Sequence, residues 1–246
     1  IDRSQQENNE GARLARVNLR SVREHEIGDE IKRCHADPSM REALYRCLGN
    51  YNRFALPNSI DGDRRWVELP FALNDGSTLV VRGVNSALIS DEYDDKDGSK
   101  LVLGAAAVAL PERDDVTYLL MCHHPPKWLR DDSIDGAIAR RAKIQLFGHV
   151  HEQMVVQYGN SVRVHSGALH PSRDRNWVPQ YNVLALSVAE LQGNRTLHVH
   201  VHARTWNSQA AHFVADGAIK DGLHVFEFGL PRLVRVIPAA PATRAP

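Results

Sequence analysis

Histidines follow directly on two apolar runs of this chain. The run 116–122 is followed at once by His123 and His124, and the run 144–147 is followed by the segment 148–151, Gly-His-Val-His. Imidazole nitrogen suits zinc, iron, manganese or copper as a ligand. A single histidine at a strand end is more often a hydrogen-bonded structural residue. Two such groups in this order indicate a transition-metal site.

The elements that must position these histidines are two strands and a helix. Both apolar runs suit strands that are buried on two faces. Pro125 and Pro126 end the first strand because proline cannot donate to a sheet ladder, and Gly148 permits a bend after the second. Residues 134–142, preceded by candidate N-cap residues, read as a helix that makes the two strands parallel neighbours. Because ligands bind outside the carboxyl ends of such strands, the histidines are expected to meet at one sheet edge.

These segments resemble motifs of the calcineurin-like metallophosphoesterases. Residues 122–126, Cys-His-His-Pro-Pro, are similar to that family's lone-histidine motif, and residues 148–151 are similar to its closing motif. Residues 81–90 resemble a strand and loop that often read GLNSALLS in bacterial members. Residues 166–171 resemble the stretch directly after the closing motif, so the likeness extends from the N-terminus to about Asp216.

The resemblance implies a hydrolase of phosphomonoesters or phosphodiesters with two divalent transition-metal ions, Mn, Fe or Zn. It implies that His123 and His149 ligate one ion and that His151 ligates the other. His124 and Asn85 are candidates for contacts with the phosphate-ester substrate. Packing is the alternative role for His124, which is expected to point away from His123 if strand geometry persists, and a turn is the alternative role for Asn85.

The family's earlier motifs are not found in this chain. These motifs, Asp-x-His, Gly-Asp-x-x-Asp and Gly-Asn-His-Asp/Glu, carry the bridging aspartate, the asparagine ligand and the histidine thought to protonate the leaving group. Residues 62–63, Gly-Asp, lack the second aspartate, and residues 49–50, Gly-Asn, precede Tyr51 rather than histidine. Residues 1–3 are similar to the segment that comes directly after the family's third motif. We therefore expect the catalytic acid or base to lie upstream, and a preceding segment or another chain to complete the site and sheet.

A catalytically dead interaction or scaffold module is the alternative, because half of a two-metal site is missing. Three imidazoles could still hold one zinc ion in an open tetrahedral site. A truncated sheet would also leave an open strand edge, which tends to recruit another chain.

The fold class expected from the resemblance is α/β, with two packed β-sheets flanked by helices in an αββα sandwich that lacks its N-terminal strands. Residues 1–229 are expected to form this metallophosphoesterase-like domain, and residues 230–246, rich in Pro and Ala, a tail. Helices are predicted over 5–48, with a stop at Gly49-Asn50, and over 101–110. Strands are further predicted at 66–73, 78–84, 154–158, 161–165, 181–188 and 196–203.

Composition limits the partners of this chain. Its 30 basic and 30 acidic residues cancel, which argues against a nucleic-acid partner and against a charged membrane surface. Three widely spaced cysteines fit a reducing compartment, so we expect a cytoplasmic protein, and no apolar run is long enough to cross a bilayer.

A further group of histidines alternates with apolar residues in the segment 198–203. On a strand, His198, His200 and His202 would share one face. We expect the valines to face the core and the imidazoles to face solvent, with a second metal site as the alternative.

Overall fold

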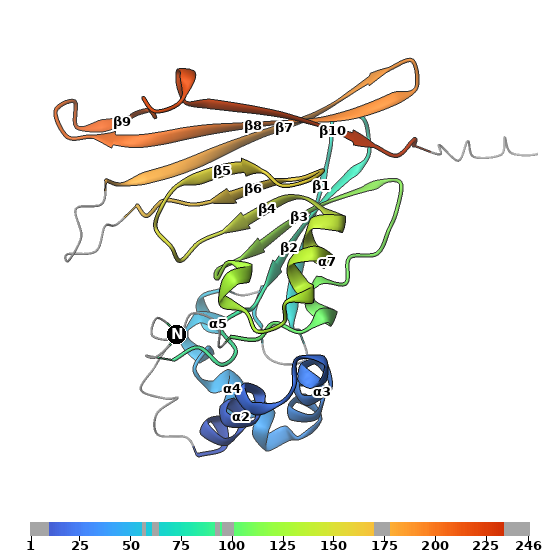
Figure 1. The fold of residues 1–246 in the computed structure, drawn as a ribbon, viewed down its shortest axis with the longest axis vertical. Coiled ribbons are helices and arrows are strands. Elements are labelled where there is room, and N and C mark those ends of the chain that lie inside the picture. Colours follow the sequence, from blue (N-terminus) through green and yellow to red (C-terminus); the bar gives the residue numbers. More distant parts are fainter. Residues whose placement is uncertain are drawn as a thin grey trace, which may run out of the picture.

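The computed structural model describes residues 10–55, 58–60, 64–91, 94, 101–169 and 178–233. It is a mixed α/β structure in which a six-stranded and a four-stranded sheet pack together and α-helices flank the larger sheet (Figure 1). The expected fold class is therefore confirmed. The division into a domain of residues 1–229 and a tail of residues 230–246 stays a prediction.

The six-stranded sheet has the order β1-β2-β3-β4-β6-β5. Its strands are β1 (Trp66–Ala72), β2 (Thr78–Val84), β3 (Val116–Cys122), β4 (Ala142–Phe147), β5 (Met154–Gln157) and β6 (Val162–His165). β2, β3, β4 and β6 run parallel, and the edge strands β1 and β5 are antiparallel to their neighbours. The carboxyl ends of β3 and β4 therefore lie side by side, as predicted for the two strands that precede the histidines.

The four-stranded sheet pairs β10 with β8 and β8 with β7, and β9 also pairs with β8. These strands are β7 (Gln180–Leu191), β8 (Asn194–Asn207), β9 (His212–Ala215) and β10 (Leu223–Leu230). Along β8, Val199 and Val201 are fully buried, whereas His198, His200 and His202 are partly exposed on the opposite face. The prediction that the valines of this segment face the core is confirmed.

Two hydrophobic clusters form the interior of the described part. One lies between the two sheets and includes Leu79, Ile144 and Val199. The other lies between the six-stranded sheet and the helices and includes Leu120 and Ile138. β3 contributes to both clusters, and this burial on two faces explains why its sequence is a continuous apolar run.

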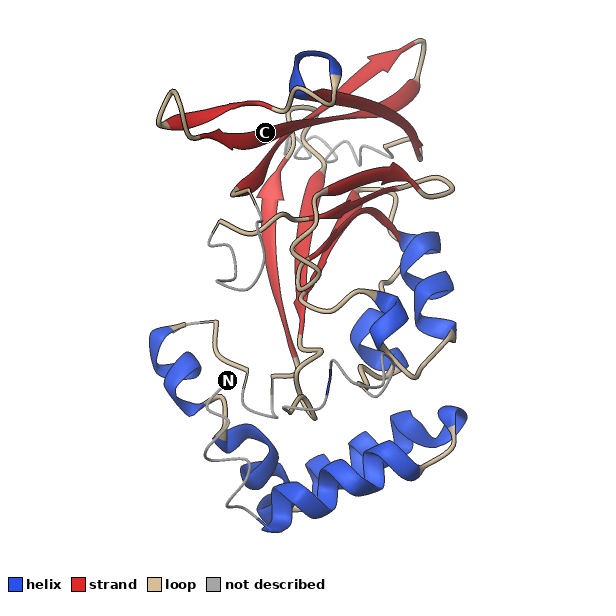
Figure 2. Ribbon diagram, turned by 60° about the vertical axis from the view of Figure 1, so that its left-hand side comes forward, coloured by secondary structure: helices blue, strands red, loops and turns tan. Residues whose placement is uncertain are grey.

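The α-helices lie beside and below the six-stranded sheet, away from the four-stranded sheet (Figure 2). They are α2 (Glu10–Ser21), α3 (Ile27–Ala36), α4 (Pro38–Arg46), α5 (Gly49–Phe54) and α7 (Ser133–Arg141). Asp37 follows α3 in an extended conformation, and its carboxylate caps α4 by accepting from the backbone N–H groups of Ser39 and Met40 at 2.9 and 3.1 Å. Among the described residues, no helix has the length and apolarity that a membrane crossing requires.

Two helix predictions are wrong. Gly49 and Asn50 begin α5 rather than stop a helix. The segment 101–110 forms no α-helix; Leu101 makes an isolated bridge to Leu129, and Ala105–Val108 form a short 3-10 turn. The physical reason is a distant partner, because the buried Asp131 carboxylate accepts hydrogen bonds from the backbone N–H groups of Leu103 and Gly104. Gly104, at a φ of 79°, supplies the left-handed conformation that this loop requires.

Candidate metal centre

The two strand tips that carry the histidines are tied together by the backbone. Cys122 at the end of β3 pairs with Phe147 at the end of β4, and the Gly148 N–H donates to the carbonyl of His123 at 3.0 Å. His123 and His149 therefore leave the sheet at the same point. The predicted meeting of the two histidine segments at one sheet edge is confirmed.

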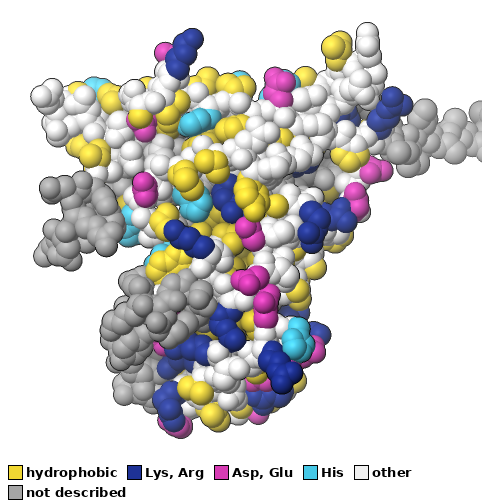
Figure 3. Space-filling view, viewed as in Figure 1, with side chains coloured by type: hydrophobic (Ala, Val, Ile, Leu, Met, Phe, Trp, Pro, Cys, Tyr) yellow, Lys and Arg dark blue, Asp and Glu magenta, His cyan; other side chains and the backbone are white. Residues whose placement is uncertain are grey.

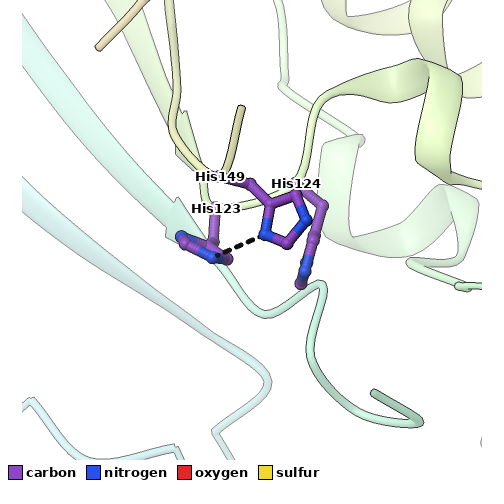
Figure 4. A group of neighbouring side chains, drawn as sticks. All are labelled: His123, His124 and His149. Carbon is purple, nitrogen blue, oxygen red and sulfur yellow. Dashed lines mark hydrogen bonds between the residues drawn. The ribbon is translucent and has the colours of Figure 1, made fainter. Parts of the chain in front are cut away.

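Three imidazoles converge there, those of His123, His124 and His149 (Figure 4). One ring nitrogen from each lies within 4.8 Å of the others, and His149 Nδ1 is 3.3 Å from His123 Nε2. Two nitrogens of a tetrahedral zinc site with bonds of about 2.0–2.1 Å are separated by roughly 3.3–3.4 Å. The spacing of His123 and His149 therefore fits a shared ion.

His124 is placed differently from the expectation that it points away from its neighbour. Its ring centroid lies 4.6 Å from that of His123 and 4.5 Å from that of His149. β3 ends at Cys122, so the alternation of side chains along a strand does not reach residues 123 and 124. The condition of that expectation, a strand that continues through residue 124, is therefore not met.

Ser86 fixes the His124 ring from the loop after β2. Its hydroxyl lies 2.9 Å from His124 Nδ1 and accepts from the His124 backbone N–H at 3.2 Å. With Nδ1 occupied, Nε2 is the nitrogen that remains for an ion, and such a partner also orients a metal-binding ring. The sequence pointed to Asn85 of this loop as a candidate substrate contact, whereas the role of Ser86 in orienting His124 was not predicted.

The turn after β4 is built differently from the prediction. His149 and His151 adopt positive φ angles of 68° and 56°, whereas Gly148 does not. Gly148 is needed for close approach, since an added Cβ would lie 3.2 Å from His123 Nδ1. Non-glycine residues in this region are uncommon, and strained backbone of this kind clusters at functional sites.

His151 lies outside the three-imidazole group that the described residues form. It is nevertheless near enough for its charge to lower the pKa of His123. Its assignment to a second ion stays a prediction.

Burial lowers the pKa of two of these imidazoles, those of His123 and His124. The pKa of His124 is lowered to about 3, chiefly by burial and then by the neighbouring charges of His123 and His149. Burial is also the largest cause that lowers the pKa of His123, followed by His149 and His151. Because a ligating imidazole must be deprotonated, His123 and His124 are in the metal-binding form at neutral pH.

The cluster opens into a pocket of about 580 Å³. Leu48, Tyr51 and Ile60 form an apolar wall, and Asn85 lies on the rim. Asn85 has the turn role that was its alternative, because its Oδ1 accepts from the Ala87 N–H at 2.9 Å. Its Nδ2 is buried without a hydrogen-bond partner in the described part of the chain, which leaves a donor for a bound molecule.

Two further features of this pocket were missed from the sequence. The Trp128 ring lies 4.3 Å from the His149 ring and covers one side of the cluster. Asp91 and Asp94 line the pocket and are bound by Arg20, whose guanidinium lies 2.6 Å and 3.6 Å from their carboxylates. Only tertiary contacts bring these residues to the histidines, so no local pattern signals them.

Comparison with known proteins gives weak structural likenesses. No protein-family model matches the chain, and no curated protein matches it. A structure of a putative 5'-nucleotidase from Staphylococcus aureus, in complex with alpha-ketoglutarate, is similar at 11% identity and a TM-score of 0.33, over 68% of this chain and 29% of that one. Vps29 from Chaetomium thermophilum, complexed with a cyclic peptide, is similar at 12% identity and a TM-score of 0.24, over 69% of this chain and 64% of that one.

A Vps29 double mutant from Entamoeba histolytica gives 10% identity and a TM-score of 0.23, over 72% of this chain and 66% of that one. The chain thus spans under a third of the nucleotidase and about two thirds of the Vps29 structures. Likenesses of this strength assign neither a family nor an activity to the chain.

Proposed function

We propose that this chain carries the histidine half of a metal-dependent phosphoesterase site, which hydrolyses a phosphomonoester or phosphodiester. The observation that carries the proposal is the convergence of His123, His124 and His149 at the tips of β3 and β4, above a pocket of about 580 Å³. The resemblance of residues 122–126 and 148–151 to metallophosphoesterase motifs supports the same reading.

His123 and His149 are common to the ligand set of the resemblance and to the group in the structure. In our proposal, His123 and His149 hold the first ion and His124 Nε2 completes its protein ligands. His151 holds the second ion, as the resemblance implies. Imidazole suits Mn, Fe and Zn alike, so the donors leave a choice among these metals.

Bound ions of this kind lower the pKa of water and offset the charge of phosphoryl oxygens. The residues of this chain would prepare the site for that chemistry. Ser86 holds His124 in one orientation through Nδ1. Trp128 keeps water from one side of His149, and Asn85 Nδ2 donates to a phosphoryl oxygen of the substrate.

The proposal requires groups that a preceding segment or another chain would supply. These are the bridging carboxylate and the catalytic acid or base, since the candidate metal group among the described residues consists of histidines alone. A partner of this kind would complete the sheet as well as the site.

We propose that the protein is cytoplasmic, since three widely spaced, buried thiols suit a reducing compartment. Positive and negative side chains are interspersed over the face seen in Figure 3, and the balance of charge argues against nucleic acid as a partner.

A second candidate function, an inactive scaffold that keeps one structural ion, is favoured by the same all-histidine group. Metal content and hydrolysis distinguish the two. The full-length protein would be loaded with manganese or zinc, its metal measured by mass spectrometry, and its hydrolysis of bis(4-nitrophenyl) phosphate followed. Two ions with hydrolysis support the enzyme, one ion without hydrolysis supports the scaffold, and no bound ion overturns both.

The matched control uses a histidine of the four-stranded sheet. His149→Ala should abolish metal binding and hydrolysis, whereas His200→Ala, on the partly exposed face of β8, should change neither. Equal effects of the two substitutions would show that the cluster is not the site.

A further inference from the structure

A second pocket lies on the far side of the short turn that comes after the histidines. This turn, η3 (Pro126–Trp128), directs Trp128 toward His149, while Lys127 lines the second pocket. The pocket has a volume of about 430 Å³ and shares no lining residue with the pocket of the metal centre. Met154 and Val156 of β5 form its apolar side. It is therefore a separate hollow and not an extension of the first.

His165 at the end of β6 is the buried polar group of this pocket. Its side chain belongs to a residue that is 6% exposed, and Nδ1 is buried without a hydrogen-bond partner in the described residues. The ring packs against Phe147 at a centroid distance of 5.6 Å. A buried ring nitrogen without a partner is costly, so a molecule that bonds to it would be stabilised.

The charges nearest His165 are positive. Lys127 is exposed and forms no ion pair with the described residues, and Arg163 lies with its guanidinium 4.0 Å from the centre of the Tyr158 ring. After burial, the charges of Arg163 and Lys127 are what lower the pKa of His165. The ring is therefore neutral near pH 7 and lies in a positive local field.

Two of the three aspartates that line the pocket already accept hydrogen bonds from other residues of the chain. Asp135 accepts from Arg163 and from the Tyr158 hydroxyl, and Asp131 accepts from backbone N–H groups of the neighbouring loop. Asp132 is exposed at the entrance. The three aspartates outnumber the two basic side chains of the lining, but the hydrogen bonds of Asp131 and Asp135 leave the end at Lys127 and His165 as the place for an anion.

We propose that this pocket binds a small organic acid, with its phosphate or carboxylate group held by Lys127 and His165 and its apolar body against Met154 and Val156. A protonated Nδ1 of neutral His165 donates to the anion, and Lys127 supplies a charge-assisted bond. The volume lies in the range of small-molecule sites, so a bare anion would fill only part of it.

Calorimetric titration of the metal-free full-length protein tests the proposal. Phenylphosphonate and benzoate serve as probes, because they share an apolar ring and differ in the anion. One or both should bind with a stoichiometry of one, and the tighter probe identifies the preferred anion. Lys127→Ala should weaken that binding about ten-fold or more, because a hydrogen bond to a charged group is lost. Lys220→Ala, at an exposed lysine of the turn Lys220–Gly222, is the matched control and should leave affinity unchanged.

A second measurement tracks the ring of His165 itself. Nitrogen-15 NMR of the histidine side chains should show one imidazole shifting on addition of the probe, and this signal should be missing in His165→Gln. If His165→Gln does not fold, the probe affinity of Lys127→Ala, a substitution at an exposed residue, tests the proposal by itself. Binding of neither probe, binding unchanged by Lys127→Ala, or binding lost in His149→Ala would each overturn the proposal. The last result would place the probe at the histidine cluster instead.

Discussion

Gly148 lies directly against the ring of His123. Its N–H donates to the His123 carbonyl at 3.0 Å, and a Cβ added to Gly148 would come within 3.2 Å of His123 Nδ1. Such a contact is tighter than carbon and nitrogen normally adopt, so any larger residue would displace the ring. The absent side chain thus keeps His123 in place.

Gly148→Ala should therefore weaken metal binding several-fold while leaving the fold intact. Isothermal titration with zinc or manganese measures the affinity, and circular dichroism reports the fold. Gly83→Ala is the matched control, because a Cβ at that β2 position meets no atom within 4 Å. Unchanged affinity in Gly148→Ala would mean that the His123 ring moves freely or does not bind the ion.

Substitutions of His124 and of His151 should show which of these two imidazoles ligates the first ion together with His123 and His149. If His124 Nε2 ligates the first ion, His124→Ala should lower the affinity for that ion more than the 10–100-fold typical of a lost supporting residue. His151→Ala should leave the first ion in place and remove only a second. Stoichiometry and affinity from the same titration distinguish the variants. Loss of the first ion in His151→Ala would contradict the assignment of His151 to a second ion.

The stability of the metal-free protein should depend on pH through His124. Its folded-state pKa is about 3, lowered first by burial, whereas the unfolded chain protonates at an ordinary value of about 6.5. Between about pH 6.5 and pH 3 the unfolded state binds a proton at His124 that the folded state does not. The free energy of unfolding that depends on this group is therefore fully present above pH 6.5 and is lost as pH falls toward 3. The slope from this one group approaches about 1.4 kcal/mol per pH unit.

Urea unfolding at several pH values between 4.5 and 7.5 measures this dependence. His124→Gln should flatten the curve relative to the unsubstituted protein, because it removes the titrating group. Parallel curves for the two proteins would contradict the assignment of this pH dependence to His124.

A buried ion pair joins the two sheets and should be sensitive to truncation. Arg195 of β8 lies 2.6 Å from Asp75 in the turn between β1 and β2, and their side chains are 2% and 8% exposed. Arg195→Ala would leave the Asp75 charge buried and should lower the free energy of unfolding by about 3–5 kcal/mol. Arg113→Ala removes an exposed pair with Asp115 and should change that free energy by less than about 1 kcal/mol. Chemical denaturation compares the two, and equal losses would show that the buried pair does not connect the sheets energetically.

The strands of the site could be read from the sequence because their signals are local. Burial on both faces favours the mostly apolar runs at 116–122 and 144–147, and Pro125 prevents the first run from continuing as a strand. The parallel pairing of β3 and β4 was predicted from the helix between them, which the structure places at Ser133–Arg141. These patterns were sufficient to bring His123 and His149 to one sheet edge.

Contacts between segments far apart in the chain determine two features that the sequence did not predict, the conformation of 101–110 and the orientation of the His124 ring. The segment 101–110 is not an α-helix because Asp131, 27 residues after Gly104, accepts hydrogen bonds from the backbone N–H groups of Leu103 and Gly104. His124 joins the cluster because Ser86, 38 residues away, orients its ring beyond the end of the strand.

By itself, then, the sequence determined the two strands of the site, their parallel order and the imidazoles that come after them, since burial and proline act on each segment locally. Only the tertiary structure decided which imidazoles meet, which glycine must lack a side chain, and that Lys127 and His165 share a second pocket. Ring orientation and close approach depend on atoms from separate elements, and no spacing along one strand specifies where those atoms lie.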